Sequence, residues 1–133
     1  MANPTYFDAM CYDELIADFG RPETFVTEIA TMPRDRLRQL QNERFMKLMT
    51  FAWKVPFYQR HWGAAGVTPS DIRSLDDISK LPPYSKSDLM ASVEAYPPIG
   101  DFHGLDTYAP EDRPPLVFQT TSGTTGRPQP LLF

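Results

Sequence analysis

The sequence indicates a mainly α-helical fold with a C-terminal β-hairpin. Apolar residues recur at three- and four-residue steps between positions 37 and 53, as one buried face of a long helix requires. Three short segments between positions 68 and 88 begin with a hydroxyl residue three positions before an aspartate, which is the spacing of a helix capping box. Two short apolar runs near the C-terminus flank a stretch rich in Thr, Ser and Gly, as two strands flank their connecting loop.

The composition favours a folded chain of one domain at most. The chain has 133 residues, of which 41% are hydrophobic and 13% aromatic, which is enough for a modest core. A net charge of −4 argues against nucleic acid as a partner. No run is long enough to span a membrane and the N-terminus lacks a signal-peptide layout, so no membrane association is expected. Cys11 is the single cysteine, which predicts no internal disulfide and a cytoplasmic protein.

The first thirty residues form an acidic arm. Residues 1–31 carry six acidic side chains against one arginine, whereas residues 33–62 are strongly basic. Short helical stretches are expected at 12–19 and 23–30, separated by a Gly-Arg-Pro sequence that ends helices. Two solvated faces explain this charge pattern, and the alternative is that the arm lies against the basic helix. We therefore separate residues 1–30 as an N-terminal arm.

The longest predicted helix follows the arm. Thr31 is expected to cap it, with Pro33 in its first turn, where a missing N–H costs nothing. Pro56 ends it and begins a shorter helix through Ala65, which Gly66 closes as a C-terminal cap. The expected buried face of the long helix comprises Leu37, Leu40, Phe45, Leu48, Met49, Ala52 and Trp53.

The middle of the chain is predicted to contain short capped helices and then an irregular segment. The capping-box spacing occurs at 68–71, 74–77 and 85–88, and each box is expected to begin one or two helical turns. Repeated prolines make residues 96–115 extended and irregular. His103 lies in that segment and is interpreted as a loop residue, either exposed or hydrogen-bonded in place, without a catalytic role.

The C-terminal hairpin is expected to hold an anion-binding loop between strands at about 115–120 and 129–133. Five hydroxyl side chains and two glycines occupy the seven positions from Thr120 to Gly126. Glycine lets a backbone approach a ligand closely, and successive backbone N–H groups form a concavity that suits anions. It is not a Walker A loop, because its glycines are three apart and no lysine follows. A plain Ser/Thr/Gly turn is the alternative interpretation, and either way we expect this long connection to be the most mobile one.

The string Thr-Ser-Gly-Thr-Thr-Gly-x-Pro, which begins at Thr121, resembles the phosphate-gripping loop of the adenylate-forming superfamily of acyl- and aryl-CoA synthetases. The resemblance implies that the loop holds the β- and γ-phosphates of ATP while a carboxylate attacks the α-phosphorus. The usual pattern has a lysine after the proline, where this chain has Gln129. The phenylacetate-CoA ligase branch of the superfamily tolerates that departure.

Further segments resemble the N-terminal region of phenylacetate-CoA ligases in order and spacing, so that the resemblance covers roughly residues 31–133. It implies that these residues are the N-terminal portion of an AMP-binding (adenylation) domain, truncated after the phosphate loop, within a larger α/β fold. The matching segments are LQNER at 40–44, VPFYQR at 55–60, AGV at 65–67, DIRSLDDI at 71–78 and LP at 81–82.

The resemblance implies a parent enzyme that is an AMP-forming aryl-acid CoA ligase, similar to phenylacetate-CoA ligases. Its substrates would be a small aryl carboxylic acid, ATP and CoA, with Mg²⁺ as the metal ion. No catalytic residue and no metal ligand of this chain is assigned. The implied nucleotide-binding residues are the hydroxyl donors Thr121, Ser122, Thr124 and Thr125, the glycines Gly123 and Gly126, and Arg127. For Arg127 two alternatives stay open: a cation that faces the phosphates, or a side chain that points to solvent.

The chain ends seven residues after Gly126, and the remaining parts of such an active site are expected downstream of the loop. The 133-residue chain is therefore expected to be an inactive fragment that self-associates through exposed apolar surface. The rival hypothesis is a stand-alone helical interaction or assembly module whose Thr/Ser/Gly turn binds no nucleotide.

Overall fold

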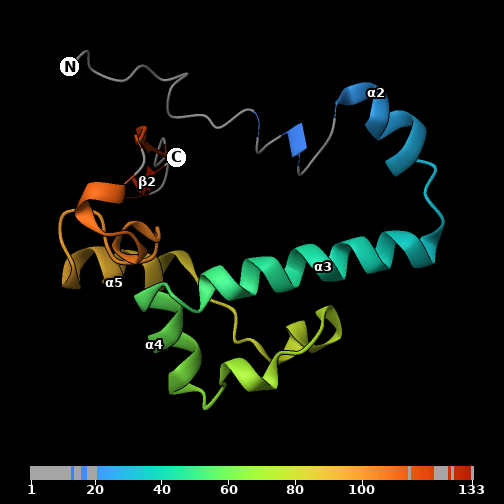
Figure 1. Cartoon of the computed structure of the whole chain (residues 1–133). Helices are drawn as coiled ribbons and strands as arrows, with labels where there is room; N and C mark the ends of the chain where they lie inside the picture. Colours follow the sequence, from blue (N-terminus) through green and yellow to red (C-terminus); the bar gives the residue numbers. More distant parts are fainter. Residues whose placement is uncertain are drawn as a thin grey trace.

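The computed structural model describes residues 13, 16–17, 21–113, 115–121, 126 and 128–132. Most of the helix expected at 12–19 lies outside these residues. Helix α2 (Pro22–Thr24) continues directly into a π-helix, η1 (Phe25–Ile29), which confirms the short helical turn predicted there. Figure 1 shows α2 beside the N-terminal end of the long helix α3, away from α4 and α5.

Helix α3 (Arg34–Ala52) is the predicted long helix, and its C-terminal half carries the core. Met49 and Ala52 are buried, as the apolar stripe predicts. Leu48 is 60% exposed, so its assignment to the buried face was wrong. The expected cap was also wrong: Pro33 occupies the N-cap position, and the Thr31 hydroxyl instead donates to the carbonyl of Thr27 at 2.7 Å.

Helix α4 (Pro56–Ala64) begins and ends as the sequence indicates. Pro56 occupies its first turn, and Gly66 adopts a φ of +77°, a left-handed conformation that glycine takes without strain. The N–H of Gly66 donates to the Gly63 carbonyl at 2.9 Å, and the N–H of Val67 donates to the Trp62 carbonyl at 3.1 Å. This pair of bonds is a Schellman motif, which satisfies the last carbonyls of the helix.

In the described part of the chain, the core consists of two apolar clusters to which α3 and α4 contribute most. The larger cluster includes a T-shaped pair of indoles, Trp53 and Trp62, whose centroids lie 5.1 Å apart. Its buried residues are Met49, Ala52, Trp62 and Ile72. The smaller cluster joins α4 to α5, and its buried residues are Val55, Phe57 and Leu89.

All three predicted capping boxes are present. They begin the 3₁₀-helices η2 (Pro69–Asp71) and η3 (Leu75–Lys80) and the α-helix α5 (Lys86–Ala95), which is longer than the one or two turns expected. In the second box the N–H of Ser74 donates to the Asp77 carboxylate at 3.1 Å. Hydrogen bonds from Lys80 and from the N–H of Arg73 lower the pKa of Asp77 to about 2. Helix η3 is tied to α3 because the N–H of Leu75 donates to the Asn42 side chain at 2.8 Å.

The proline-rich segment after α5 is irregular, as predicted, apart from two 3₁₀ turns, η4 (Leu105–Thr107) and η5 (Pro110–Asp112). The Pro97–Pro98 peptide bond is cis. His103 is held within this segment, because its Nε2 lies 2.7 Å from the Gly100 carbonyl and its Nδ1 accepts from the N–H of Leu105 at 3.1 Å.

The chain ends in an antiparallel hairpin of β1 (Phe118–Thr120) and β2 (Pro130–Leu132). Phe118 pairs with Leu132 and Thr120 with Pro130. The hairpin occurs where it was predicted, with shorter strands, so the mainly α fold with a C-terminal β-hairpin is confirmed. Within the described residues, no helix combines the length and apolar character that crossing a bilayer requires.

Candidate functional site

The candidate phosphate-binding loop is closed by two hydrogen bonds between Thr121 and Gln129. The N–H of Thr121 donates to the Gln129 carbonyl, and the N–H of Gln129 donates to the Thr121 hydroxyl oxygen, each at 3.0 Å. Residues 122–128 therefore connect two residues that are fixed to each other. The backbone N–H and C=O of Gln129 pair with the hydroxyl and the backbone N–H of Thr121. Gln129 stands where the adenylate-forming pattern has lysine, and its backbone takes part in this closure.

The structure describes two of the seven predicted site residues. The Thr121 hydroxyl accepts a hydrogen bond from Gln129, and its own O–H remains a donor. Gly126 is exposed, and no described atom lies within 4 Å of the position that a Cβ would occupy. The predicted site residues outside the described part of the chain are Ser122, Gly123, Thr124, Thr125 and Arg127.

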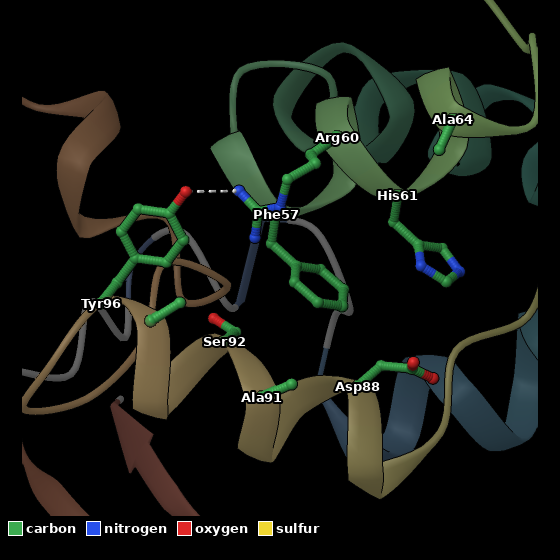
Figure 2. A pocket seen from close by; sticks show the side chains of 9 residues that line it. Phe57, Arg60, His61, Ala64, Asp88, Ala91, Ser92 and Tyr96 are labelled. Atoms are coloured by element: carbon green, nitrogen blue, oxygen red, sulfur yellow. Dashed lines mark hydrogen bonds between the residues drawn. The ribbon is translucent and has the colours of Figure 1, made fainter.

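A second feature, absent from the sequence-based predictions, is an open cleft of about 490 Å³ between α4 and α5. Figure 2 shows Arg60 and His61 of α4 facing Ala91, Ser92 and Asp88 of α5 across it. Three alanines line the cleft, Ala64, Ala91 and Ala95, and their small side chains leave space between the two helices. The residues that line the cleft are Phe57, Arg60, His61, Ala64, Asp88, Ala91, Ser92, Ala95 and Tyr96.

A buried carboxylate holds the cationic wall of this cleft. Asp101 is only 4% exposed and receives two hydrogen bonds from Arg60, from Nη1 at 2.8 Å and from Nη2 at 3.0 Å. The Ser92 hydroxyl donates to the same carboxylate at 2.7 Å and accepts from the N–H of Asp101 at 3.0 Å. The Arg60 guanidinium also lies 4.9 Å from the centroid of the Tyr96 ring, and its Nη1 donates to the Tyr96 hydroxyl at 3.4 Å (Figure 2). We call these four residues the Arg60–Asp101 network.

Gly100 makes the network sterically feasible. Its φ is +80°, and a Cβ at this position would lie 2.8 Å from the Ser92 hydroxyl and 2.7 Å from the Phe102 ring. Any other residue would be strained there and would push against the hydroxyl that binds Asp101. Glycine therefore lets the chain after the prolines pass close enough to α5 for Asp101 to reach both helices.

The electrostatics of the network favour ionised partners. Burial acts to raise the pKa of Asp101, but hydrogen bonds from Arg60 and Ser92 outweigh burial and hold that pKa below its usual range. The same pairing raises the pKa of Arg60. The cation in the cleft is thus already matched by an internal anion, so the network serves to join α4, α5 and the following segment.

We expect the stabilisation from Asp101 to disappear in acid. Its pKa in the folded chain is depressed, so its contribution is complete above the unfolded value of about 3.9 and is lost as the pH falls through the folded value. The free energy of unfolding of the parent chain should therefore exceed that of Asp101→Asn at pH 6, and the gap should narrow below about pH 4. Urea titrations of both chains at a series of pH values measure this. A gap that is constant down to pH 2 contradicts the expected linkage.

Sequence reasoning had little chance of finding the network. Arg60 and Asp101 are separated by 41 positions, and neither belongs to a local pattern that pairs them. The glycine before Asp101 and the prolines before that glycine indicate a turn, but they do not show which residue Asp101 would contact. The capping boxes were recognisable, in contrast, because both members of each box lie within four residues.

Comparison with known proteins identifies relatives of this chain. No protein-family model matches it. It is 37% identical over 102 residues to the phenylacetate-coenzyme A ligase of Thermus thermophilus, a match covering 76% of this chain and 21% of that protein. The phenylacetate-coenzyme A ligase of Escherichia coli is 36% identical over 106 residues, a match that covers 79% of this chain and 22% of that protein.

Solved structures agree with the curated relatives. An open conformation of 2-hydroxyisobutyryl-CoA ligase, in complex with 2-HIB-AMP and CoA, superposes with a TM-score of 0.61 at 32% identity. That match covers 75% of this chain and 22% of the ligase. The same enzyme in its thioesterification state also gives a TM-score of 0.61, at 36% identity. That match covers 75% of this chain and 20% of the ligase.

The chain is therefore a relative of the CoA ligases of the adenylate-forming family. Its curated homologues are phenylacetate-coenzyme A ligases, and it corresponds to their N-terminal part. It spans about a fifth of the length of these relatives.

Proposed function

We propose that this chain provides the N-terminal part of an AMP-forming ligase that joins an aryl carboxylic acid to CoA, and that residues 121–127 grip the phosphates of ATP. Its homology to phenylacetate-coenzyme A ligases is the observation that carries the proposal. The hairpin supports it, because the pairing of Thr121 with Gln129 fixes both ends of the loop. On this proposal residues 31–133 are the first portion of the adenylation domain, and residues 1–30 are an arm outside it.

The proposed reaction has two steps. The carboxylate of the acid attacks the α-phosphorus of ATP, which releases pyrophosphate and forms an acyl adenylate. The CoA thiol then attacks the acyl carbon and displaces AMP. Negative charge moves onto the pyrophosphate during the first step, so preorganised donors around the β- and γ-phosphates stabilise the transition state.

The residues of this chain would act in the first step only. Thr121, Ser122, Thr124 and Thr125 would donate hydroxyl hydrogen bonds, while Gly123 and Gly126 let the backbone approach the phosphates. Arg127 would supply the positive charge that the pattern usually takes from a lysine after the proline. In the described part of the chain, no three His, Cys, Asp or Glu side chains gather as metal ligands, and we assign no Mg²⁺ ligand here.

A chimeric enzyme tests the proposal. In it, residues 1–133 of this chain replace the corresponding N-terminal fifth of the Thermus thermophilus ligase. With ATP, Mg²⁺, CoA and phenylacetate the chimera is expected to form phenylacetyl-CoA, detected by chromatography. The isolated chain should form none, because a phosphate loop alone does not orient a carboxylate for in-line attack. Turnover by the isolated chain above a heat-killed control contradicts this expectation.

Two further results decide between the hypotheses. Parallel assays with 2-hydroxyisobutyrate, the acid in the name of the solved relative, separate an aryl-acid ligase from one that prefers a small hydroxy acid. A folded chimera that carries out no pyrophosphate exchange with either acid favours the rival module, whose Thr/Ser/Gly turn binds no nucleotide.

A further inference from the structure

A large apolar groove on the other side of α4 is not used by the proposed phosphate loop. It has a volume of about 340 Å³ and runs between the C-terminal half of α3, helix η3 and the segment that precedes α5. Leu48 and Phe51 line it from α3, Ile78 from η3, and Tyr84 from the segment before α5. None of its described lining residues carries a charge.

The groove lies directly against the principal core. Met49, Ala52 and Trp62 belong to the larger core cluster and also line the groove, so its floor is the core itself. Its rim is exposed to water, with Leu48 at 60% and Ile78 at 52% exposure. Isolated apolar side chains on a surface are ordinary, but a continuous hollow of this kind that opens onto a core marks a binding surface.

We propose that this groove is the docking surface for an apolar segment of the ligase polypeptide that follows the phosphate loop. This inference rests on the proposed function. The length of the solved relative supports this occupant, because the chain superposes on 2-hydroxyisobutyryl-CoA ligase with a TM-score of 0.61 yet covers only 22% of it. In a ligase of that size, most of the polypeptide remains to pack against this part. The absence of charge in the groove requires that the docking side chains be apolar too.

Leu48→Glu in the chimera, compared with the same change in the isolated chain, tests the groove. Leucine and glutamate have similar helix propensities, so α3 itself should tolerate the substitution. In the isolated chain Leu48 faces water, and the urea midpoint should stay unchanged. In the chimera the docked segment would bury the glutamate, and the melting temperature should fall by several degrees.

Val26→Glu is the matched control. Val26 lies in η1, is 63% exposed and does not line the groove. We expect it to leave the melting temperature of the chimera unchanged. If the glutamate variant at position 48 does not yield soluble chimera, Leu48→Ala against Val26→Ala gives the same comparison in milder form, with a smaller but selective loss at position 48.

Two outcomes overturn the inference. Equal melting temperatures for the Leu48 and Val26 variants of the chimera mean that the groove is not covered by the ligase. The isolated chain could instead form a dimer that Leu48→Glu dissociates, while the melting temperature of the chimera does not change. The occupant of the groove is then a second copy of the chain. The proposed function fails separately: a chimera that is selectively destabilised at Leu48 but forms no acyl-CoA supports the docking surface and contradicts the activity.

Discussion

We expect Gly123→Val to abolish ATP–pyrophosphate exchange in the chimera, whereas Thr125→Ala should leave measurable exchange. Valine adds a β-branched side chain in a loop that is proposed to bring its backbone against phosphate. It would obstruct all the backbone donors nearby, and the loss of even one preorganised donor costs about a hundredfold or more in rate. Thr125→Ala removes one hydroxyl among several and should cost about 1–3 kcal/mol, the value of a hydrogen bond to a charged group.

A second glycine provides the control for this experiment. Gly63 lies on the exposed face of α4, and a Cβ there would meet no atom within 4 Å. Gly63→Val should keep near-parental exchange, so a loss at Gly123 cannot be assigned to valine as such. Circular dichroism verifies that each variant is folded. If Gly123→Val is folded and exchanges pyrophosphate at the parental rate, the loop does not grip phosphate and is a plain turn.

The sequence predicted those features of the fold that depend on neighbours along the chain. Each capping box places its serine or threonine and its aspartate within one turn, so its geometry follows from spacing alone. Gly66 was predictable for the same reason, because only a left-handed residue completes the end of α4. The hairpin was predictable because it consists of two apolar runs and the connection between them, and the sequence shows all three.

Features that depend on tertiary contacts were missed or assigned wrongly. Helical periodicity placed Leu48 on the buried face, but the structure leaves it at the rim of an uncovered groove. Periodicity identifies the face that a helix buries in the complete protein. Under the proposed function, the complete protein includes ligase polypeptide beyond this chain. The Thr31 cap failed because α3 begins at Arg34, which puts Pro33 at the N-cap position, while the Thr31 hydroxyl donates to a carbonyl of the preceding helical turn. The phosphate-binding roles assigned to residues 121–127 remain predictions, and of these residues the structure describes only Thr121 and Gly126.

Arg60→Met should destabilise the isolated chain more than Asp101→Asn. Removing the arginine leaves the Asp101 carboxylate buried, with Ser92 as its one remaining side-chain partner among the described residues. Breaking a fully buried ion pair in this way costs roughly 3–5 kcal/mol. The Arg60 side chain is 47% exposed, so we expect a smaller loss of about 2–3 kcal/mol. Asp101→Asn keeps an acceptor for Arg60 and leaves no buried charge, and should cost about 1 kcal/mol.

The double variant separates an ion-pair network from two independent effects. Asp101→Asn removes the buried charge that makes Arg60→Met costly, so the double variant should be no less stable than Arg60→Met alone. Urea unfolding of the four chains, followed by circular dichroism, gives the free energies. Arg36→Met, an exposed arginine on α3, should change the stability by less than about 0.5 kcal/mol and controls for the loss of positive charge. Additive losses at Arg60 and Asp101 would mean that the carboxylate is not held in place by the arginine.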